Sequence, residues 1–277
     1  MSGRRVKVRR PVLRYHGGKW RLAPWIIAHF PAHRVYVEPF GGAASVLLRK
    51  QRSYAEVYND MDGEIVNLFR VLRDRSQAAE LVRLVGLTPF AREEFRQSYL
   101  PADDPVERAR RLVFRSFAGY GSGLNARYGT GFRNDTKKTG TTPARDWSRM
   151  PAHLGSVIER LQGVVIEQAP AFDLLRIFDS KETLFYCDPP YVHGTRNNRH
   201  IGDAYRYEMT DEDHRAMAAL LHGLGGMVVL SGYRCDLYDE LFADWRRIDK
   251  AARADSGASR VESLWLSPTV QVQARLF

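Results

Sequence analysis

A short apolar run in the second half of the chain stops at an acid, two prolines and an aromatic residue. Residues 183–187 (Thr-Leu-Phe-Tyr-Cys) have the length and composition of a buried strand. The tetrad Asp188, Pro189, Pro190 and Tyr191 follows directly. This arrangement predicts a strand of a parallel α/β sheet whose end opens to a ligand. A simpler interpretation is a strand that ends in a proline-rich turn, with Tyr191 packed on the surface.

Strand and helix patterns alternate over most of the chain. Strands are expected at residues 35–38, 55–58, 164–166, 183–187 and 227–230, with edge strands at 246–251 and 263–266. Helices are expected to start at residue 43, to follow residues 59–60 and residue 166, and to run from Thr210 to about Gly223. This alternation predicts an α/β fold, with helices on both faces of a mostly parallel sheet.

Residues 74–155 interrupt the alternation. Helical patterns come first, and a glycine-rich basic segment follows at about 119–131. A loop this long inside a compact domain is usually functional or disordered. We therefore expect an inserted, mainly helical subdomain at 74–155, between the two parts of a main domain at 1–73 and 156–277. Side chains here that suit contacts with phosphates and bases are Tyr120, Asn125, Arg127, Tyr128 and Arg133. The alternative is a flexible surface excursion.

Positive charge is concentrated in two segments. The net charge is +10, yet residues 1–21 and residues 108–149 each carry +8, which leaves −6 on the rest. Focused basic segments attract polyanions and guide their approach, whereas a merely soluble basic protein would spread its charge. The distribution favours a nucleic-acid partner.

Other features exclude several classes of protein. The chain has no apolar run of about 18 residues that could span a membrane, and its N-terminus lacks the apolar segment of a secretory signal. Cys187 and Cys235 match no metal-ligand or disulfide spacing. We therefore expect no metal site and a reducing, cytoplasmic location.

The first turn from strand to helix contains Glu38, Pro39, Phe40, Gly41 and Gly42. Ligands usually bind at this point of an open α/β sheet, and glycines let the backbone approach them closely. The full glycine pattern of dinucleotide-binding turns is absent, which favours an adenosine ligand without a pyrophosphate, most commonly S-adenosylmethionine. Asp60 lies 19 residues after Gly41, where an acid can hold ribose hydroxyls. A helix N-cap is its alternative role.

A second glycine turn lies near the N-terminus and contains Tyr15, His16, Gly17, Gly18, Lys19 and Trp20. The ammonium group of Lys19 could neutralise a carboxylate or a phosphate. His16 and His193 are weaker candidates for acid–base chemistry, because an isolated histidine is more often structural.

These motifs, in this order, resemble the Dam-type DNA adenine-N6 methyltransferase family. The matching segments are residues 15–19, 37–42, 59–60, 188–191 and 260–265. Residues 192–196, 207–209 and 214 are similar to members from bacterial viruses and prophages. The resemblance covers nearly the whole chain. It implies a Rossmann-like S-adenosylmethionine-dependent methyltransferase sheet with an inserted target-recognition subdomain.

The resemblance also implies roles for single residues. The catalytic residues are Asp188, Pro189, Pro190 and Tyr191. The cofactor contacts are Tyr15, Gly17, Gly18, Lys19, Glu38, Pro39, Phe40, Gly41, Gly42, Asp60, Phe172 and Asp188. Phe172 lies beside the cofactor adenine, and Ala171 stands where the family often has an acid. Arg196 joins the basic segment as a DNA contact. The insertion differs from that of the GATC-specific members, so their target sequence does not transfer.

The implied reaction is the site-specific transfer of a methyl group to the exocyclic N6 amine of an adenine flipped out of double-stranded DNA. The Asp188 carboxylate and the Pro189 carbonyl would accept the amine hydrogens, and Tyr191 would stack on the base. The resemblance also implies a bacterial or phage-infected cell, a place in restriction–modification, and a protein that is a monomer or weak dimer. Methylation of cytosine N4, methylation of RNA adenine and a DNA-binding module with a degenerate cofactor pocket stay open.

Overall fold

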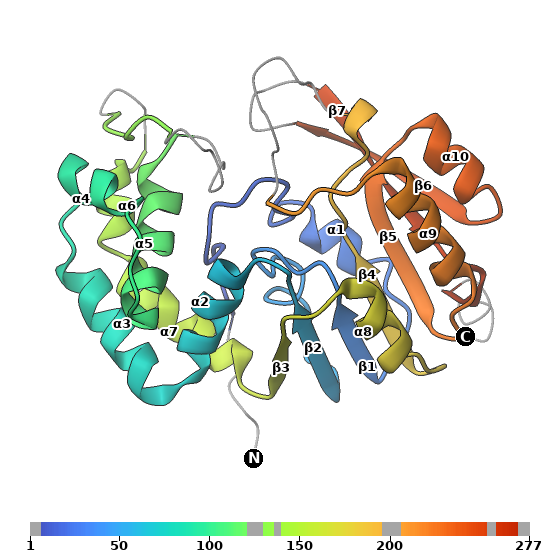
Figure 1. Cartoon of the computed structure of the whole chain (residues 1–277), viewed down its shortest axis with the longest axis horizontal. Helices are drawn as coiled ribbons and strands as arrows, with labels where there is room; N and C mark the ends of the chain where they lie inside the picture. Colours follow the sequence, from blue (N-terminus) through green and yellow to red (C-terminus); the bar gives the residue numbers. More distant parts are fainter. Residues whose placement is uncertain (1–6, 121–129, 136–139, 196–205, 254–258, 271–277) are drawn as a thin grey trace.

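The computed structural model describes residues 7–120, 130–135, 140–195, 206–253 and 259–270. Its centre is a sheet with the strand order β3-β2-β1-β4-β5-β7-β6 (Figure 1). The strands are β1 (Val35–Glu38), β2 (Ala55–Asn59), β3 (Val164–Glu167), β4 (Thr183–Cys187), β5 (Met227–Tyr233), β6 (Arg246–Arg253) and β7 (Ser259–Leu266). Strands β1 to β5 are parallel, and β7 runs antiparallel between β5 and β6. The expected α/β sheet is confirmed. Of the two strands expected at an edge, however, only β6 lies at one, and β7 is an inner strand.

The middle of the sheet determines where a ligand can bind. Strands β1 and β4 are neighbours, and the sheet continues from β1 to β2 on one side and from β4 to β5 on the other. The connections therefore diverge at this point, which leaves a crevice beyond the carboxyl ends of the strands. Val35 pairs with Thr183, so Glu38 and Asp188 come at the ends of neighbouring strands.

Helices cover both faces of the sheet, as expected. Successive side chains of a strand point to opposite faces: Tyr36 packs in one core with helices α1 and α2, whereas Val37 packs in another with α8, α9 and α10. Their bounds are α1 (Ala23–Ile27), α2 (Gly63–Arg73), α8 (Ala171–Ile177), α9 (Asp211–His222) and α10 (Asp236–Leu241). Thr210 caps α9 through a capping box with Asp213, as its position predicts. Across the described residues, no helix is long and apolar enough to cross a membrane.

A group of helices stands beyond β3, on the left of Figure 1. They are α3 (Arg75–Leu87), α4 (Arg92–Gln97), α5 (Pro105–Ala118), α6 (Pro143–Trp147) and α7 (Met150–Leu161). The Asp104 side chain caps α5, whose apolar side packs in the same core as Tyr36. These helices therefore extend the core of the sheet, and α7 runs past residue 155, where the insertion was expected to end.

The helix expected from residue 43 does not form. Residues 42–49 make successive turns instead. Ala44 has a φ of +52°, in the left-handed region, and this conformation interrupts a right-handed helix. The backbone N–H of Leu47 donates to Glu38 Oε1 at 2.7 Å, so the turns bring an amide to the end of β1.

Candidate functional site

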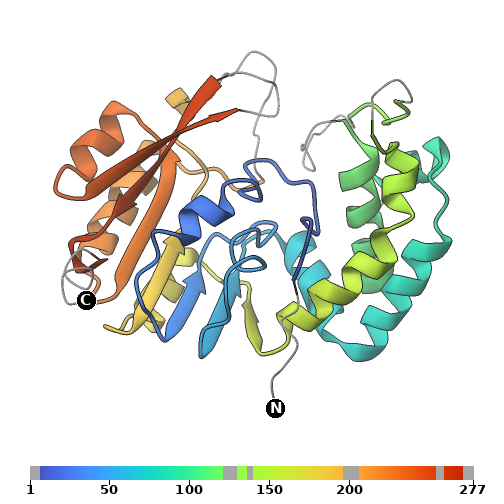
Figure 2. The same ribbon diagram turned by 180° about the vertical axis from the view of Figure 1, so that it is seen from behind.

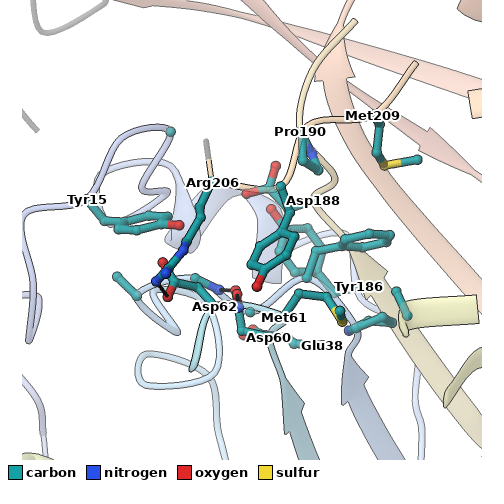
Figure 3. A pocket seen from close by; sticks show the side chains of 18 of the residues that line it. Tyr15, Glu38, Asp60, Met61, Asp62, Tyr186, Asp188, Pro190, Arg206 and Met209 are labelled. Carbon is teal, nitrogen blue, oxygen red and sulfur yellow. Dashed lines mark hydrogen bonds and ion pairs between the residues drawn. The ribbon is translucent and has the colours of Figure 1, made fainter. Parts of the chain in front are cut away.

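A cavity of about 520 Å³ opens at the carboxyl ends of β1, β2 and β4 (Figure 3). Every residue expected to contact the cofactor lines it. They are Tyr15, Gly17, Gly18, Lys19, Glu38, Pro39, Phe40, Gly41, Gly42, Asp60, Phe172 and Asp188. His16 lines the cavity as well. The fold thus brings the glycine turns and strand ends together, although they are far apart in sequence.

The turn after β1 can form only with glycine at position 41. A Cβ atom on Gly41 would lie 2.2 Å from the Tyr58 ring and 2.8 Å from the carbonyl oxygen of Asn59. Gly42 has a φ of +48°, and its Cβ would lie 3.0 Å from the Tyr15 ring. The Asn59 side chain donates to the Pro39 carbonyl at 2.8 Å, which ties the turn to β2. Bare backbone therefore forms one wall of the cavity.

Asp60 holds this turn in place. Its Oδ2 accepts the Gly42 N–H at 2.7 Å, and its Oδ1 accepts the Asp62 N–H at 2.8 Å. Burial raises the pKa of Asp60 to about 6 despite these bonds. The alternative interpretation of Asp60 as a helix N-cap is wrong, because the side chain of Asp62 caps α2. Asp60 is left at the cavity wall, where it can accept further hydrogen bonds.

Glu38 is a buried acid at the end of β1. Its Oε1 accepts from the Tyr36 hydroxyl at 2.6 Å and from the Leu47 N–H at 2.7 Å. Burial raises its pKa to about 7, well above the ordinary value of 4.5. The residue therefore lies close to its titration midpoint at neutral pH.

Asp188 follows β4 and reaches the cavity with fixed partners. Its Oδ1 accepts from the Ser231 hydroxyl at 2.8 Å and lies 3.0 Å from the Lys19 ammonium. Lys19 also donates to the Gly17 carbonyl at 2.8 Å and lies 3.5 Å from Glu262. The carboxylate that Lys19 neutralises in this structure is thus one of the protein's own.

Tyr191 is buried, so the interpretation that packs it on the surface is wrong. Its hydroxyl donates to Glu262, and the Lys19 ammonium lies over its ring, 4.6 Å from the centroid. Tyr233 contacts the same ring edge to face, at 4.7 Å between centroids. Within the tetrad, Asp188 and Pro190 line the cavity. Tyr191 does not line the cavity but contacts Lys19 and Glu262 next to it.

Two residues of the site had no role assigned to them from the sequence. Glu262 of β7 lies in the matching segment 260–265, but no contact was expected of its side chain. Ser231 of β5 lies in no motif. The available signal for Glu262 was its place within that matching segment, and its side chain is buried. Its pKa is raised by burial.

One rim of the cavity includes residues 207–209, which matched family members but had no site role assigned to them from the sequence. It is lined by Arg206, Tyr207, Glu208 and Met209, and Arg206 approaches Asp62 at 3.3 Å (Figure 3). The first residues of α8 form an adjoining part of the cavity wall. Ala171 lines the cavity where the family often has an acid, and Asp173, two positions further on, lines it as well.

The predicted DNA contacts are only partly described by the structure. Asn125, Arg127, Tyr128 and Arg196 lie outside the described residues. Tyr120 is 47% exposed, next to the end of α5. The Arg133 guanidinium donates to the Phe117 carbonyl at 2.8 Å, which satisfies the carboxyl end of that helix. Arg133 thus has a structural role, and its role toward DNA stays a prediction.

Comparisons with known proteins agree with this geometry. The D12 class N6 adenine-specific DNA methyltransferase family matches residues 15–255. A DNA adenine methylase of Escherichia coli K12 is 27% identical over 197 residues, which cover 68% of this chain and 66% of the relative. A DNA adenine methylase of Serratia marcescens is 34% identical over 118 residues, which cover 39% of this chain and 42% of the relative. The chain thus spans slightly less than two thirds of the Escherichia coli relative. It belongs to the D12 class N6 adenine-specific DNA methyltransferase family.

Proposed function

We propose that this protein transfers a methyl group from S-adenosylmethionine to the N6 amine of adenine in double-stranded DNA. The observation that carries the proposal is the position of Asp188: its carboxylate lies in the cavity that all the expected cofactor residues line. Membership of the D12 class and the similarity to DNA adenine methylases support adenine over the other substrates.

The cavity suits a ligand with an adenosine and a charged amino-acid end. The backbone of Gly41 and Gly42 allows close approach, and Phe40 and Phe172 supply apolar surface for a base. Asp60 is placed to accept ribose hydroxyls, and Lys19 and Asp188 offer both signs of charge to an amino acid. S-adenosylmethionine, when bound, supplies a methyl group on a positively charged sulfur.

Asp188 and Pro189 would act on the target amine. The lone pair of an adenine amine is delocalised into the ring, which makes the nitrogen a poor nucleophile. The Asp188 carboxylate and the Pro189 carbonyl can accept its two hydrogens, which favours a pyramidal nitrogen and stabilises the positive charge that develops there. The fixed φ of proline limits how this carbonyl can turn. Ser231 and Lys19 hold Asp188 in position at 2.8 and 3.0 Å.

The expectation that Tyr191 stacks on the flipped base requires a change of role. Both the ring and the hydroxyl of Tyr191 are engaged, by Lys19, Tyr233 and Glu262. We assign Tyr191 to positioning Lys19 and therefore Asp188. Pro190, which lines the cavity, is the member of the tetrad that can contact a base.

The helices from α3 to α7 would form the target-recognition part, with its basic segment directed to DNA. In this proposal the insertion ends with α7 at Leu161. The base would leave the duplex to reach the cavity, because its amine is not accessible to Asp188 within the stack.

The test is to treat unmethylated duplex DNA with S-adenosylmethionine and wild-type protein, then to identify the modified nucleoside. We expect N6-methyladenine, and no product with Asp188→Ala, while DNA affinity persists. N4-methylcytosine, or faster modification of RNA than of DNA, would favour one of the alternative substrates. DNA binding without cofactor affinity would identify a binding module. Wild-type turnover by Asp188→Ala would refute the assignment of Asp188.

A further inference from the structure

A second hollow lies beside the cofactor cavity. It is a groove of about 870 Å³ between the N-terminal segment and the helices α5 to α7. Figure 2 shows the N-terminal segment (dark blue) passing between the sheet and these helices. Tyr15, Gly18 and Ser45 line both the groove and the cavity. The two hollows therefore adjoin.

Basic side chains dominate the groove. They are Lys7, Arg9, Arg10, Arg14, Arg21 and Arg149, against the single carboxylate of Asp146. Asp146 is already neutralised, because its two oxygens accept from the Arg10 guanidinium at 2.9 and 3.1 Å. Burial lowers the pKa of His153, which lines the groove too, to about 4. His153 is therefore neutral at physiological pH, and the groove has a large positive excess.

The groove is held open by its own contacts. The pair between Arg10 and Asp146 joins the N-terminal segment to α6. Arg10 also lies over the Phe117 ring of α5, 4.9 Å from its centroid. Two walls from distant parts of the chain are thus fixed to each other.

The outer cations point to a partner outside the chain. Lys7, Arg9, Arg21 and Arg149 are exposed, and no carboxylate of the described residues pairs with them in an ion pair. Arg149 is also the N-cap of α7, whose first turn contains no acid. Like charges held together repel one another, and a polyanion relieves this repulsion as it releases counterions.

We propose that this groove binds the phosphodiester backbone of the DNA substrate where the DNA enters the methyl-transfer site. The inference rests on the proposed function and deepens it. Arginine and lysine contacts to phosphates position a duplex without reading its sequence. The groove would therefore contribute equally to DNA with and without the target site, unlike contacts that recognise bases.

The experiment measures DNA affinity against salt concentration for wild-type protein and for the double variant Arg9→Gln/Arg149→Gln. Loss of two phosphate contacts should reduce the slope of log K against log salt by about 1.8. Affinity at low salt should fall by the same factor for target and non-target duplexes. Arg246→Gln, an exposed arginine at the start of β6 on the far side of the sheet, is the matched control. Equal melting temperatures of all three proteins establish that the fold is intact.

The outcome separates this proposal from the function on which it rests. If the double variant has the same salt slope as Arg246→Gln, or loses affinity only for the target duplex, the groove does not bind the DNA backbone. If the double variant has a reduced slope but the wild-type protein yields no methylated adenine, the groove binds DNA and the proposed methyl transfer is wrong. If the wild-type protein methylates adenine and the slope of the double variant is unchanged, the methyl transfer stands and the role of the groove is wrong.

Discussion

The cofactor cavity and the basic groove share one wall, yet their charged groups differ in sign and in burial. In the cavity, Glu38 is buried and Asp60 is half-buried, and backbone N–H groups hold their carboxylates at 2.7 to 2.8 Å. In the groove, Arg9, Arg21 and Arg149 are exposed on flexible side chains. The cavity therefore depends on the placement of atoms, and the groove depends on the sum of its charge.

This difference determines how each region should respond to change. A buried charge is tolerated only where specific partners compensate its lost hydration. An exposed cation attracts phosphate over about 10 Å at ordinary salt, so its exact position matters less. Single substitutions should therefore have large effects in the cavity, whereas the groove should respond in proportion to the charge that is removed.

The largest effect is expected from an added methyl group at the turn after β1. Gly41→Ala would place Cβ 2.2 Å from Tyr58, and overpacking of this kind lowers the free energy of unfolding by about 3 kcal/mol. The matched change is Gly155→Ala on α7, where nothing lies within 4 Å. It should raise stability by about 0.5–1 kcal/mol, because alanine favours a helix. Urea unfolding followed by circular dichroism measures both. Equal midpoints for the two variants would show that the turn after β1 can accommodate a Cβ atom at position 41.

An intermediate effect is expected from the buried acid. The pKa of Glu38 is raised to about 7 by burial, so its stabilising contribution is complete below about pH 4.5 and is lost as pH rises through 7. Glu38→Gln keeps a hydrogen-bond acceptor at this position but removes the titrating carboxyl, so the stability of the variant does not fall with pH for this reason. Between about pH 5 and pH 8 the variant should gain on the order of 2 kcal/mol relative to wild type. Thermal unfolding across this range, with exposed Glu182→Gln as the control, measures the gain. A constant difference would mean that Glu38 does not titrate here.

The smallest effect is expected at the rim that faces solvent. Arg206 pairs with Asp62 at 3.3 Å, and its side chain is 55% exposed. Such a pair contributes at most about 1 kcal/mol, so Arg206→Ala should weaken S-adenosylmethionine binding by no more than about fivefold. Arg215→Ala breaks a similar exposed pair with Glu240, at 3.1 Å and away from the cavity, and should leave binding unchanged. Isothermal titration calorimetry compares the two. A much larger loss would place Arg206 among the precise contacts of the cavity.

Local patterns in the sequence predicted much of the fold. The parallel strands and the cap at Thr210 appear where apolar runs and capping residues indicated them, because both signals act within a few residues. The helix from residue 43 failed for a tertiary reason. Asp60 accepts from Gly42, and Glu38 accepts from Leu47. These two acids hold the segment in turns that the propensities of Ala43 and Ala44 do not favour.

The candidate site divides along the same line. The sequence alone determined the expected cofactor residues and Asp188, since glycine turns and strand-end acids are short motifs with a chemical purpose. Only the tertiary structure placed Glu262 against Lys19 and Tyr191, and brought Arg149 and Arg9 to the same groove. Such partners come from segments at least 71 residues apart, and no local pattern records which of them meet. Their meeting is decided by sheet order and helix packing, which depend on the burial of the whole core.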